Sequence, residues 1–132
     1  SCCHKNVDWT QNYHDFLDTE NRIRSDLREF FDRNPQPIFY GWGGVFVWIL
    51  SQFTLDDSAG ELVDDLRVYH GKRVPGTSIQ IKGLEDLDAG AGKVFLLCVN
   101  SIYHKSITEK VGEIFPNATV YGITGAGICK LN

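Results

Sequence analysis

A glycine-rich corner is the stretch in which residue type and spacing point most directly to chemistry. The sequence Gly41-Trp42-Gly43-Gly44 separates residues 37–40, which predict a buried strand, from residues 45–50, an apolar run that predicts a helix. Glycine has no Cβ, so it permits a sharp turn or the close approach of a ligand. The free N–H groups at the start of the helix would face an anion above the end of the strand. The corner is therefore a candidate phosphate site, with Gly43 as the expected point of closest approach.

The glycines of this corner partly match a dinucleotide-binding fingerprint. Gly41 and Gly43 have the spacing of its first two glycines, but Phe46 occupies the position of the third. Trp42 also brings a large indole to the place where a pyrophosphate would rest. Two interpretations stay open: a ligand-binding corner, and a structural corner whose glycines only make a tight turn.

Two adjacent carboxylates follow the second predicted strand. Asp64 lies 23 positions after Gly41, and a dinucleotide-binding domain carries its ribose-binding acid about 20 residues further on. Asp64 or Asp65 would then accept hydrogen bonds from ribose hydroxyls; the alternative is an ordinary acidic turn. Lys72 and Arg73 lie in a turn that contains glycine and proline, where they either meet a phosphate or are only exposed.

A third set of polar residues follows the apolar run 93–99. Asn100 and Ser101 end this run, and His104 stands near the start of the next predicted helix. His104 can act as an acid, a base or a hydrogen-bond donor, or it can be a helix-start residue with Ser101 as the cap. The sequence contains no nucleophile elbow, Walker A loop or H-E-x-x-H motif. No self-sufficient catalytic centre is visible, so enzymatic activity stays an open question.

The N-terminal part of the chain predicts a tail followed by one long helix. Apolar residues recur there at spacings of seven, four and three, which places them on one helix face: Phe16, Ile23, Leu27 and Phe30. We expect a tail at residues 1–14 and a helix at residues 15–34, which Pro35 ends.

The rest of the chain alternates strand-like and helix-like patterns, which is typical of an α/β domain. Short apolar runs predict five strands, at residues 37–40, 61–64 or 61–69, 78–81, 93–99 and 118–123. We expect a single Rossmann-like three-layer domain over residues 1–132, with an α/β core at residues 37–123 and an extra N-terminal helix. The expected sheet is mainly parallel, with strand order 3-2-1-4-5, and residues 124–127 are expected to be flexible. The ligand crevice of such a sheet lies where the order reverses, between the loops after strands one and four.

The composition limits the class of partner. The 132 residues carry a net charge of −4, which gives no general attraction to nucleic acid or to an anionic membrane. No apolar run approaches the roughly 20 residues of a membrane span. The four cysteines do not form a disulfide framework, so we expect free thiols and a reducing, cytoplasmic location. Cys2-Cys3-His4 lacks the paired spacing of a metal site, and no metal is expected.

Residues 71–81, with the sequence GKRVPGTSIQI, carry a family resemblance. The segment resembles one in the C-terminal Rossmann-like domain of sugar C-methyltransferases, where a glycine corner and an acidic second strand precede it. The order of motifs also looks like that of the small nucleotide-sugar-binding domain of sugar acyltransferases. The resemblance covers residues 37–123. It implies a domain that helps to hold a nucleotide-sugar, while a catalytic partner domain or protein binds the methyl donor.

The sequence therefore predicts a nucleotide or nucleotide-sugar binding domain, an accessory part of a methyltransferase-like system that acts on sugars or natural products. Its expected partner is a small-molecule nucleotide, bound by Gly41, Trp42, Gly43, Gly44, Asp64, Asp65, Asn100, Ser101 and His104. Two alternatives stay open: an NAD(P)-dependent oxidoreductase domain, with NAD(P) as its cofactor, and a non-catalytic scaffold or interaction domain. Phe46, at the third fingerprint position, argues against the oxidoreductase.

Overall fold

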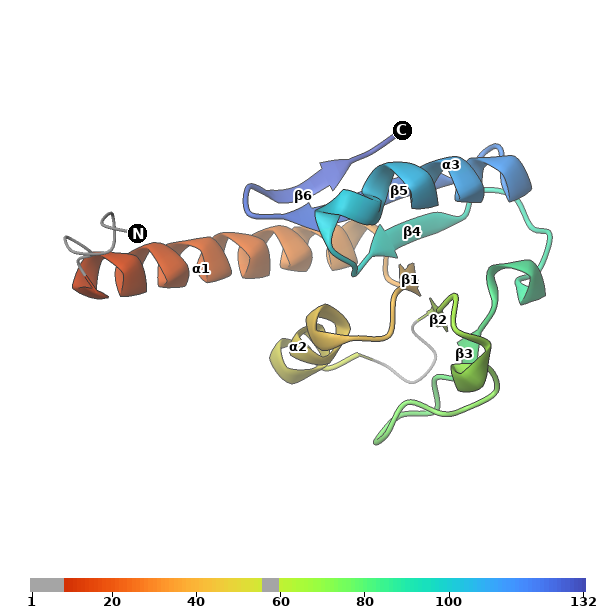
Figure 1. Cartoon of the computed structure of the whole chain (residues 1–132), viewed down its shortest axis with the longest axis horizontal. Helices are drawn as coiled ribbons and strands as arrows, with labels where there is room; N and C mark the ends of the chain where they lie inside the picture. The colour runs from red at the N-terminus through yellow and green to blue at the C-terminus, as the bar shows by residue number, and fades with distance from the viewer. Residues whose placement is uncertain (1–8, 56–59) are drawn as a thin grey trace, which may run out of the picture.

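The computed structural model describes residues 9–55 and 60–132 (Figure 1). The helices are α1 (Trp9–Arg33), α2 (Gly44–Gln52) and α3 (His104–Ile114), with short 3-10 turns η2 (Arg67–Tyr69), η3 (Leu84–Asp86) and η4 (Ser101–Tyr103). The strands are β1 (Ile38–Tyr40), β2 (Glu61–Val63), β3 (Ile81–Lys82), β4 (Val94–Leu97), β5 (Thr119–Thr124) and β6 (Gly127–Lys130). None of the described helices is long and apolar enough to cross a membrane.

The strands form one mixed, mostly parallel sheet in the order β3-β2-β1-β4-β5-β6. The α/β class is confirmed, but the sheet has six strands where five were expected, and the strand order differs because β6 is added beyond β5. β6 pairs antiparallel with β5 through Ile123 and Ile128. The residues expected to be flexible make its turn, in which the Ala126 N–H donates to Thr124 Oγ1 at 3.1 Å. A short turn is enough to join antiparallel strands, so no crossover helix marks β6 in the sequence.

Helices cover both faces of the sheet. On one face α1 and α2 bury an apolar cluster that includes Leu27, Phe39 and Phe46. On the other face α3 and η3 bury a second cluster, in which Tyr40 of β1 takes part. Alternate residues of a strand point to opposite faces, which explains why Phe39 and Tyr40 belong to different clusters. The sheet is thus the middle layer of three.

Helix α1 begins at Trp9, so the predicted tail is wrong for residues 9–14, while its residues 1–8 lie outside the described part of the chain. Trp9 and Tyr13 precede Phe16 at spacings of four and three, which continues the helical pattern upstream. The polar residues between them have only modestly unfavourable helix propensities and do not end a helix. At the other end the Asn34 N–H still donates to Phe30 O at 2.8 Å before Pro35 stops the helix.

The segment 71–81, which carries the family resemblance, folds back on itself beside β3. Arg73 pairs antiparallel with Gln80, and the Ile81 N–H donates to Lys72 O at 2.8 Å. The turn buries Val74 and Ile79 under the α2 face of the sheet. β3 is therefore shorter than the predicted strand at residues 78–81, because part of that run pairs with its own loop.

Candidate functional site

The glycine corner turns at Gly41, directly after β1. Gly41 has a φ of +113°, in the left-handed region that favours glycine. A Cβ on Gly41 would lie 2.6 Å from Val99 Cγ1 and 3.2 Å from the carbonyl oxygen of Cys98. The loops after β1 and β4 are therefore in contact at the point where the strand order reverses.

Gly43 does not make the turn of this corner. Its φ of −172° is extended backbone that any residue adopts, so the turn does not lie there. Gly43 precedes α2, and no side chain caps this helix start within the described residues. A Cβ added to Gly43 or Gly44 would have no described atom within 4 Å other than those of its chain neighbours and its own helix. The start of α2 is open on the side where these two glycines lie.

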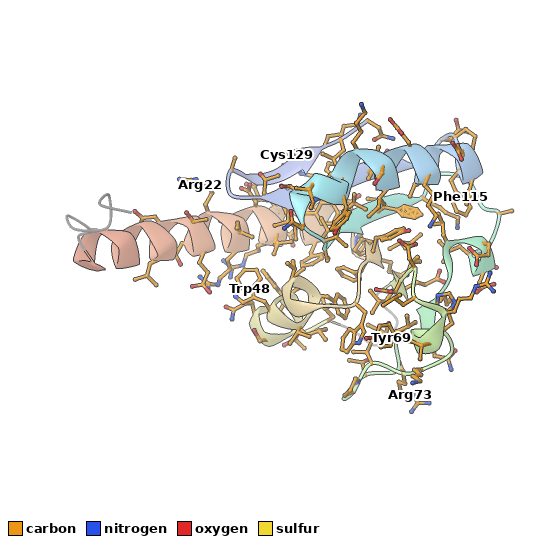
Figure 2. The ribbon with its side chains drawn as sticks, in the orientation of Figure 1. Arg22, Trp48, Tyr69, Arg73, Phe115 and Cys129 are labelled. Atoms are coloured by element: carbon orange, nitrogen blue, oxygen red, sulfur yellow. The ribbon has the colours of Figure 1, made fainter. Side chains whose placement is uncertain are left out.

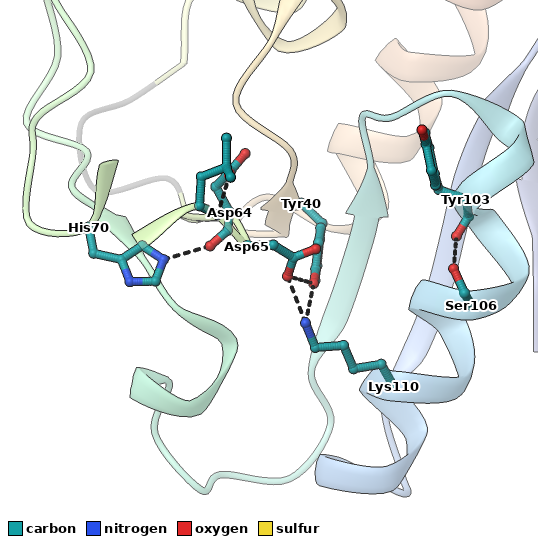
Figure 3. Close-up of polar contacts among 8 residues, drawn as sticks. Tyr40, Asp64, Asp65, His70, Tyr103, Ser106 and Lys110 are labelled. Atoms are coloured by element: carbon teal, nitrogen blue, oxygen red, sulfur yellow. Dashed lines mark hydrogen bonds and ion pairs between the residues drawn. The ribbon is translucent and has the colours of Figure 1, made fainter. Parts of the chain in front are cut away.

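The carboxylate of Asp64 holds the corner in place. Asp64 Oδ2 accepts a hydrogen bond from the Trp42 N–H at 2.8 Å, and Oδ1 accepts one from the Leu66 N–H at 2.8 Å. Its backbone carbonyl lies 2.6 Å from His70 Nε2 (Figure 3). Both carboxylate oxygens are used by the backbone of the two loops, so the acidic-turn interpretation fits Asp64 better than the ribose interpretation.

Asp65 belongs to a polar cluster at the ends of β1 and β2 (Figure 3). Its Oδ1 accepts a hydrogen bond from the Tyr40 hydroxyl at 2.5 Å and one from Lys110 Nζ at 2.7 Å. Lys110 Nζ lies 3.4 Å from the Tyr40 hydroxyl. Tyr40 is buried, whereas the side chains of Asp65 and Lys110 are about half exposed. The cluster joins α3 to two strand ends and presents one carboxylate and one ammonium to solvent.

The electrostatics of this cluster fix its protonation. Burial is the largest cause that raises the pKa of Tyr40 far above its ordinary value, and the hydrogen bond to Asp65 is the next. The phenol therefore stays protonated and donates a hydrogen bond to Asp65. Burial acts to raise the pKa of Asp65, but the hydrogen bonds from Lys110 and Tyr40 outweigh it and hold that pKa below its ordinary value. At neutral pH the Tyr40 phenol is therefore protonated and the Asp65 carboxyl group is ionised.

The residues after β4 are placed by local structure. Asn100 Oδ1 accepts from the Ile102 N–H at 3.1 Å and caps η4, so the cap predicted at Ser101 is wrong and belongs to its neighbour. His104 is the first residue of α3 and is only 7% exposed. Its Nε2 lies 3.2 Å from Val99 O. A Cβ on Gly122 of β5 would lie 2.6 Å from the His104 ring, so the imidazole packs between α3 and the sheet.

The structure brings together one group of three predicted site residues. Gly41, Trp42 and Asp64 form the corner between β1 and β2. Asp65 adjoins it, but its partners Tyr40 and Lys110 were not among the predicted residues. The signal for Tyr40 was its position at the end of the first predicted strand, directly before the glycines. Lys110 had no comparable signal, because its helix reaches the site only through the strand order.

The described residues contain no group of three His, Cys, Asp or Glu side chains that could hold a metal ion. Cys2-Cys3-His4 lies outside the described residues. Comparisons with protein-family models, with curated proteins and with solved structures gave no match. The function is therefore inferred from the geometry of the site and from the sequence pattern.

Proposed function

We propose that this chain is a Rossmann-like domain that binds a nucleotide or a nucleotide-sugar at the carboxyl ends of β1, β2 and β4. The observation that carries the proposal is the left-handed Gly41, packed against Val99 where the strand order reverses. Ligands of open α/β sheets bind in the crevice at such a reversal. The resemblance of residues 71–81 to the C-terminal domain of sugar C-methyltransferases points to the same ligand class.

The phosphate group of the ligand is assigned to the start of α2. Gly43 and Gly44 leave this helix start open, and no described side chain caps it. The first N–H groups of a helix are unpaired within the helix, and its dipole favours an anion there. The net charge of −4 means that any attraction for a phosphate must be local, and this helix start provides it.

The sugar of the ligand is assigned to Asp65. Both oxygens of Asp64 already accept backbone N–H groups, whereas Asp65 Oδ2 has no hydrogen bond within the described residues. A carboxylate that is 53% exposed can accept from sugar hydroxyls. Lys110 is close enough to hold the carboxylate ionised and to donate to an anionic group.

The NAD(P)-dependent alternative is less well supported. Phe46 is fully buried, with its ring centroid 5.1 Å from that of Phe39 and 6.0 Å from that of Trp42. In a dinucleotide fingerprint this position is small, so that helix and strand pack closely. We therefore favour a nucleotide or nucleotide-sugar, and we assign catalysis to a separate partner domain or protein.

The test is a thermal-shift screen followed by calorimetric titration. The chain is incubated with nucleotides, nucleotide-sugars, NAD(P) and S-adenosylmethionine, and a ligand of the folded state raises the melting temperature with concentration. We expect a nucleotide or nucleotide-sugar to bind, with affinity reduced in Asp65→Asn and unchanged in the control Asp32→Asn, an exposed position on α1. Absence of binding by every nucleotide tested would overturn the proposal.

A further inference from the structure

Helix α1 carries a mostly apolar repeat that continues beyond the part of the helix that packs on the sheet. Seven positions follow one another at alternating spacings of four and three, the heptad pattern of helices that pair with other helices. Six of them are apolar, namely Trp9, Tyr13, Phe16, Ile23, Leu27 and Phe30, and the charged Glu20 takes the seventh. Leu27 and Phe30 are buried against the sheet. Figure 1 shows the N-terminal half of α1 extending beyond the sheet. The same pattern continues into this projecting half, where the sheet offers it no surface.

An apolar groove lies where α1 leaves the sheet. Its volume is about 320 Å³, and its apolar lining is Ile23 of α1, Val45 and Trp48 of α2, and Ile123 of β5. Thr19, Glu20 and Gly44 complete the lining. Val45 is 37% exposed. Trp48 lies between the two helices (Figure 2), where its Nε1 donates to Glu20 Oε1 at 3.0 Å. The groove thus adjoins the projecting half of α1 and can receive large apolar side chains.

The charge along α1 is divided between its halves. From residue 9 to residue 21 there are three acids and no lysine or arginine, whereas from residue 22 to residue 33 there are four arginines and three acids. Arg24 lies beside the groove, with its guanidinium 6.0 Å from the centre of the Trp48 ring. Glu20 of the same helix already contacts this guanidinium at 3.8 Å, so an acidic helix end that entered the groove would share Arg24 with Glu20. Two antiparallel copies of α1 place the acidic half of one helix beside the arginine-containing half of the other. Two parallel copies would place the two acidic halves beside each other.

We propose that the chain forms a twofold homodimer in which the projecting half of each α1 occupies the groove of the other copy. Each copy has one projecting apolar repeat and one apolar groove on the same helix, so a single twofold contact covers both grooves and both repeats. The antiparallel direction sets the acidic half of each helix against Arg22 and Arg24 of its partner helix. This assembly uses α1 and the start of α2, where Gly44 and Val45 line the groove, so it borders the helix start to which we assign the phosphate.

The experiment measures the mass of the full chain in solution by light scattering over a concentration series. The parent chain is expected to be a dimer. Tyr13→Glu changes the projecting repeat, and Val45→Arg changes the groove, so each variant alone is expected to associate at least tenfold more weakly. Ile102→Glu is the matched control, because Ile102 is a 75% exposed apolar residue on the turn after β4, and it is expected to remain dimeric.

An equimolar mixture of the two variants provides the decisive measurement. In the mixed dimer one contact keeps both parent residues, and the other sets the new glutamate against the new arginine. Association is therefore expected to return on mixing, with circular dichroism confirming that each variant is folded. A parent chain that is monomeric at every concentration would overturn the proposal. Dimers that persist in either variant, or a mixture that stays monomeric, would overturn it equally, because the contact would then not be the reciprocal one.

Discussion

Asp64 and Trp42 are linked by a 2.8 Å hydrogen bond from the backbone N–H of Trp42 to Asp64 Oδ2. Trp42 lies in the loop after β1 and Asp64 in the loop after β2, so this contact ties together two loops at the carboxyl edge of the sheet. The second carboxylate oxygen accepts the Leu66 N–H. An acid that seemed suited to a ribose therefore has a structural role, and it shapes the corner at which we place the phosphate.

Asp64→Ala is expected to destabilise the protein by about 2–3 kcal/mol, because two backbone N–H groups lose a charged acceptor. Urea denaturation at neutral pH measures the loss. The control Asp32→Ala, at an exposed position of α1, should stay within about 0.5 kcal/mol of the parent. Equal stability of the two variants would show that the loops are held by other contacts.

Gly41→Ala is expected to cost at least about 1–2 kcal/mol from the backbone alone, since Gly41 has a φ of +113°. Contacts of the new Cβ with Val99 Cγ1 and Cys98 O would add to that cost. Gly43→Ala is the matched comparison, because its backbone is extended and its surroundings are open. Thermal melts should show a clearly lower melting temperature for Gly41→Ala only. A lower melting temperature for Gly43→Ala only would mean that the chain turns at Gly43.

The same Gly43→Ala variant tests the phosphate assignment. A methyl group at the start of α2 would stand where the ligand's phosphate approaches the backbone, so affinity should fall more than tenfold, or about 1.4 kcal/mol, in a folded protein. Calorimetric titration with the best nucleotide from the screen measures this change. Unaltered affinity would mean that the phosphate of the ligand does not bind at the start of α2.

The stability contributed by Asp65 is expected to depend on pH. Its pKa is lower in the folded protein than the ordinary value of about 3.9. The contribution is therefore complete above about pH 4 and is lost as the pH falls through the folded-state pKa. The difference in unfolding free energy between the parent and Asp65→Asn should stay constant above about pH 4 and shrink below it. Denaturation curves over this range are the measurement, and a difference that does not vary with pH would contradict the assignment.

Leu27→Ala is expected to cost about 2–5 kcal/mol, because Leu27 is fully buried between α1 and the sheet. Val47→Ala is the control, since Val47 is 49% exposed on α2 and its loss should be much smaller. Chemical denaturation compares the two variants. A loss within about 0.5 kcal/mol for Leu27→Ala would mean that this face of α1 contributes little to the core.

The sequence was informative where one local pattern decides the structure. Apolar runs such as residues 93–99 contain the parallel strands, and the spacing of Ile23, Leu27 and Phe30 predicts the buried face of α1. It was uninformative for β6, because a short strand after a tight glycine turn has the same composition as a flexible end. These differences follow from physics: parallel core strands must be apolar on both faces, while a short edge strand need not be.

The polar cluster shows why two of its three residues, Tyr40 and Lys110, were not predicted. Tyr40 and Asp65 are 25 positions apart, and Asp65 and Lys110 are 45 positions apart. No short motif connects such residues, and only the order of the strands brings them together. His104 is the opposite case, because its residue type suggested a chemical role but its side chain is buried beside Gly122. The spacing of residues in the sequence does not reveal the contact between His104 and Gly122.

The loop that folds back beside β3 has a consequence for aggregation. β3 ends the sheet on one side, and an exposed strand edge offers unpaired backbone groups to other chains. Here the Gly71 N–H donates to Ile81 O at 2.8 Å, and the Ile81 N–H donates to Lys72 O at 2.8 Å. Both backbone groups of Ile81 are thus occupied by the chain itself, and the exposed Lys72 and Arg73 stand next to this edge. A foreign strand that reached β3 would have to displace this loop before it could pair, so the loop protects the sheet from growing by edge-to-edge addition.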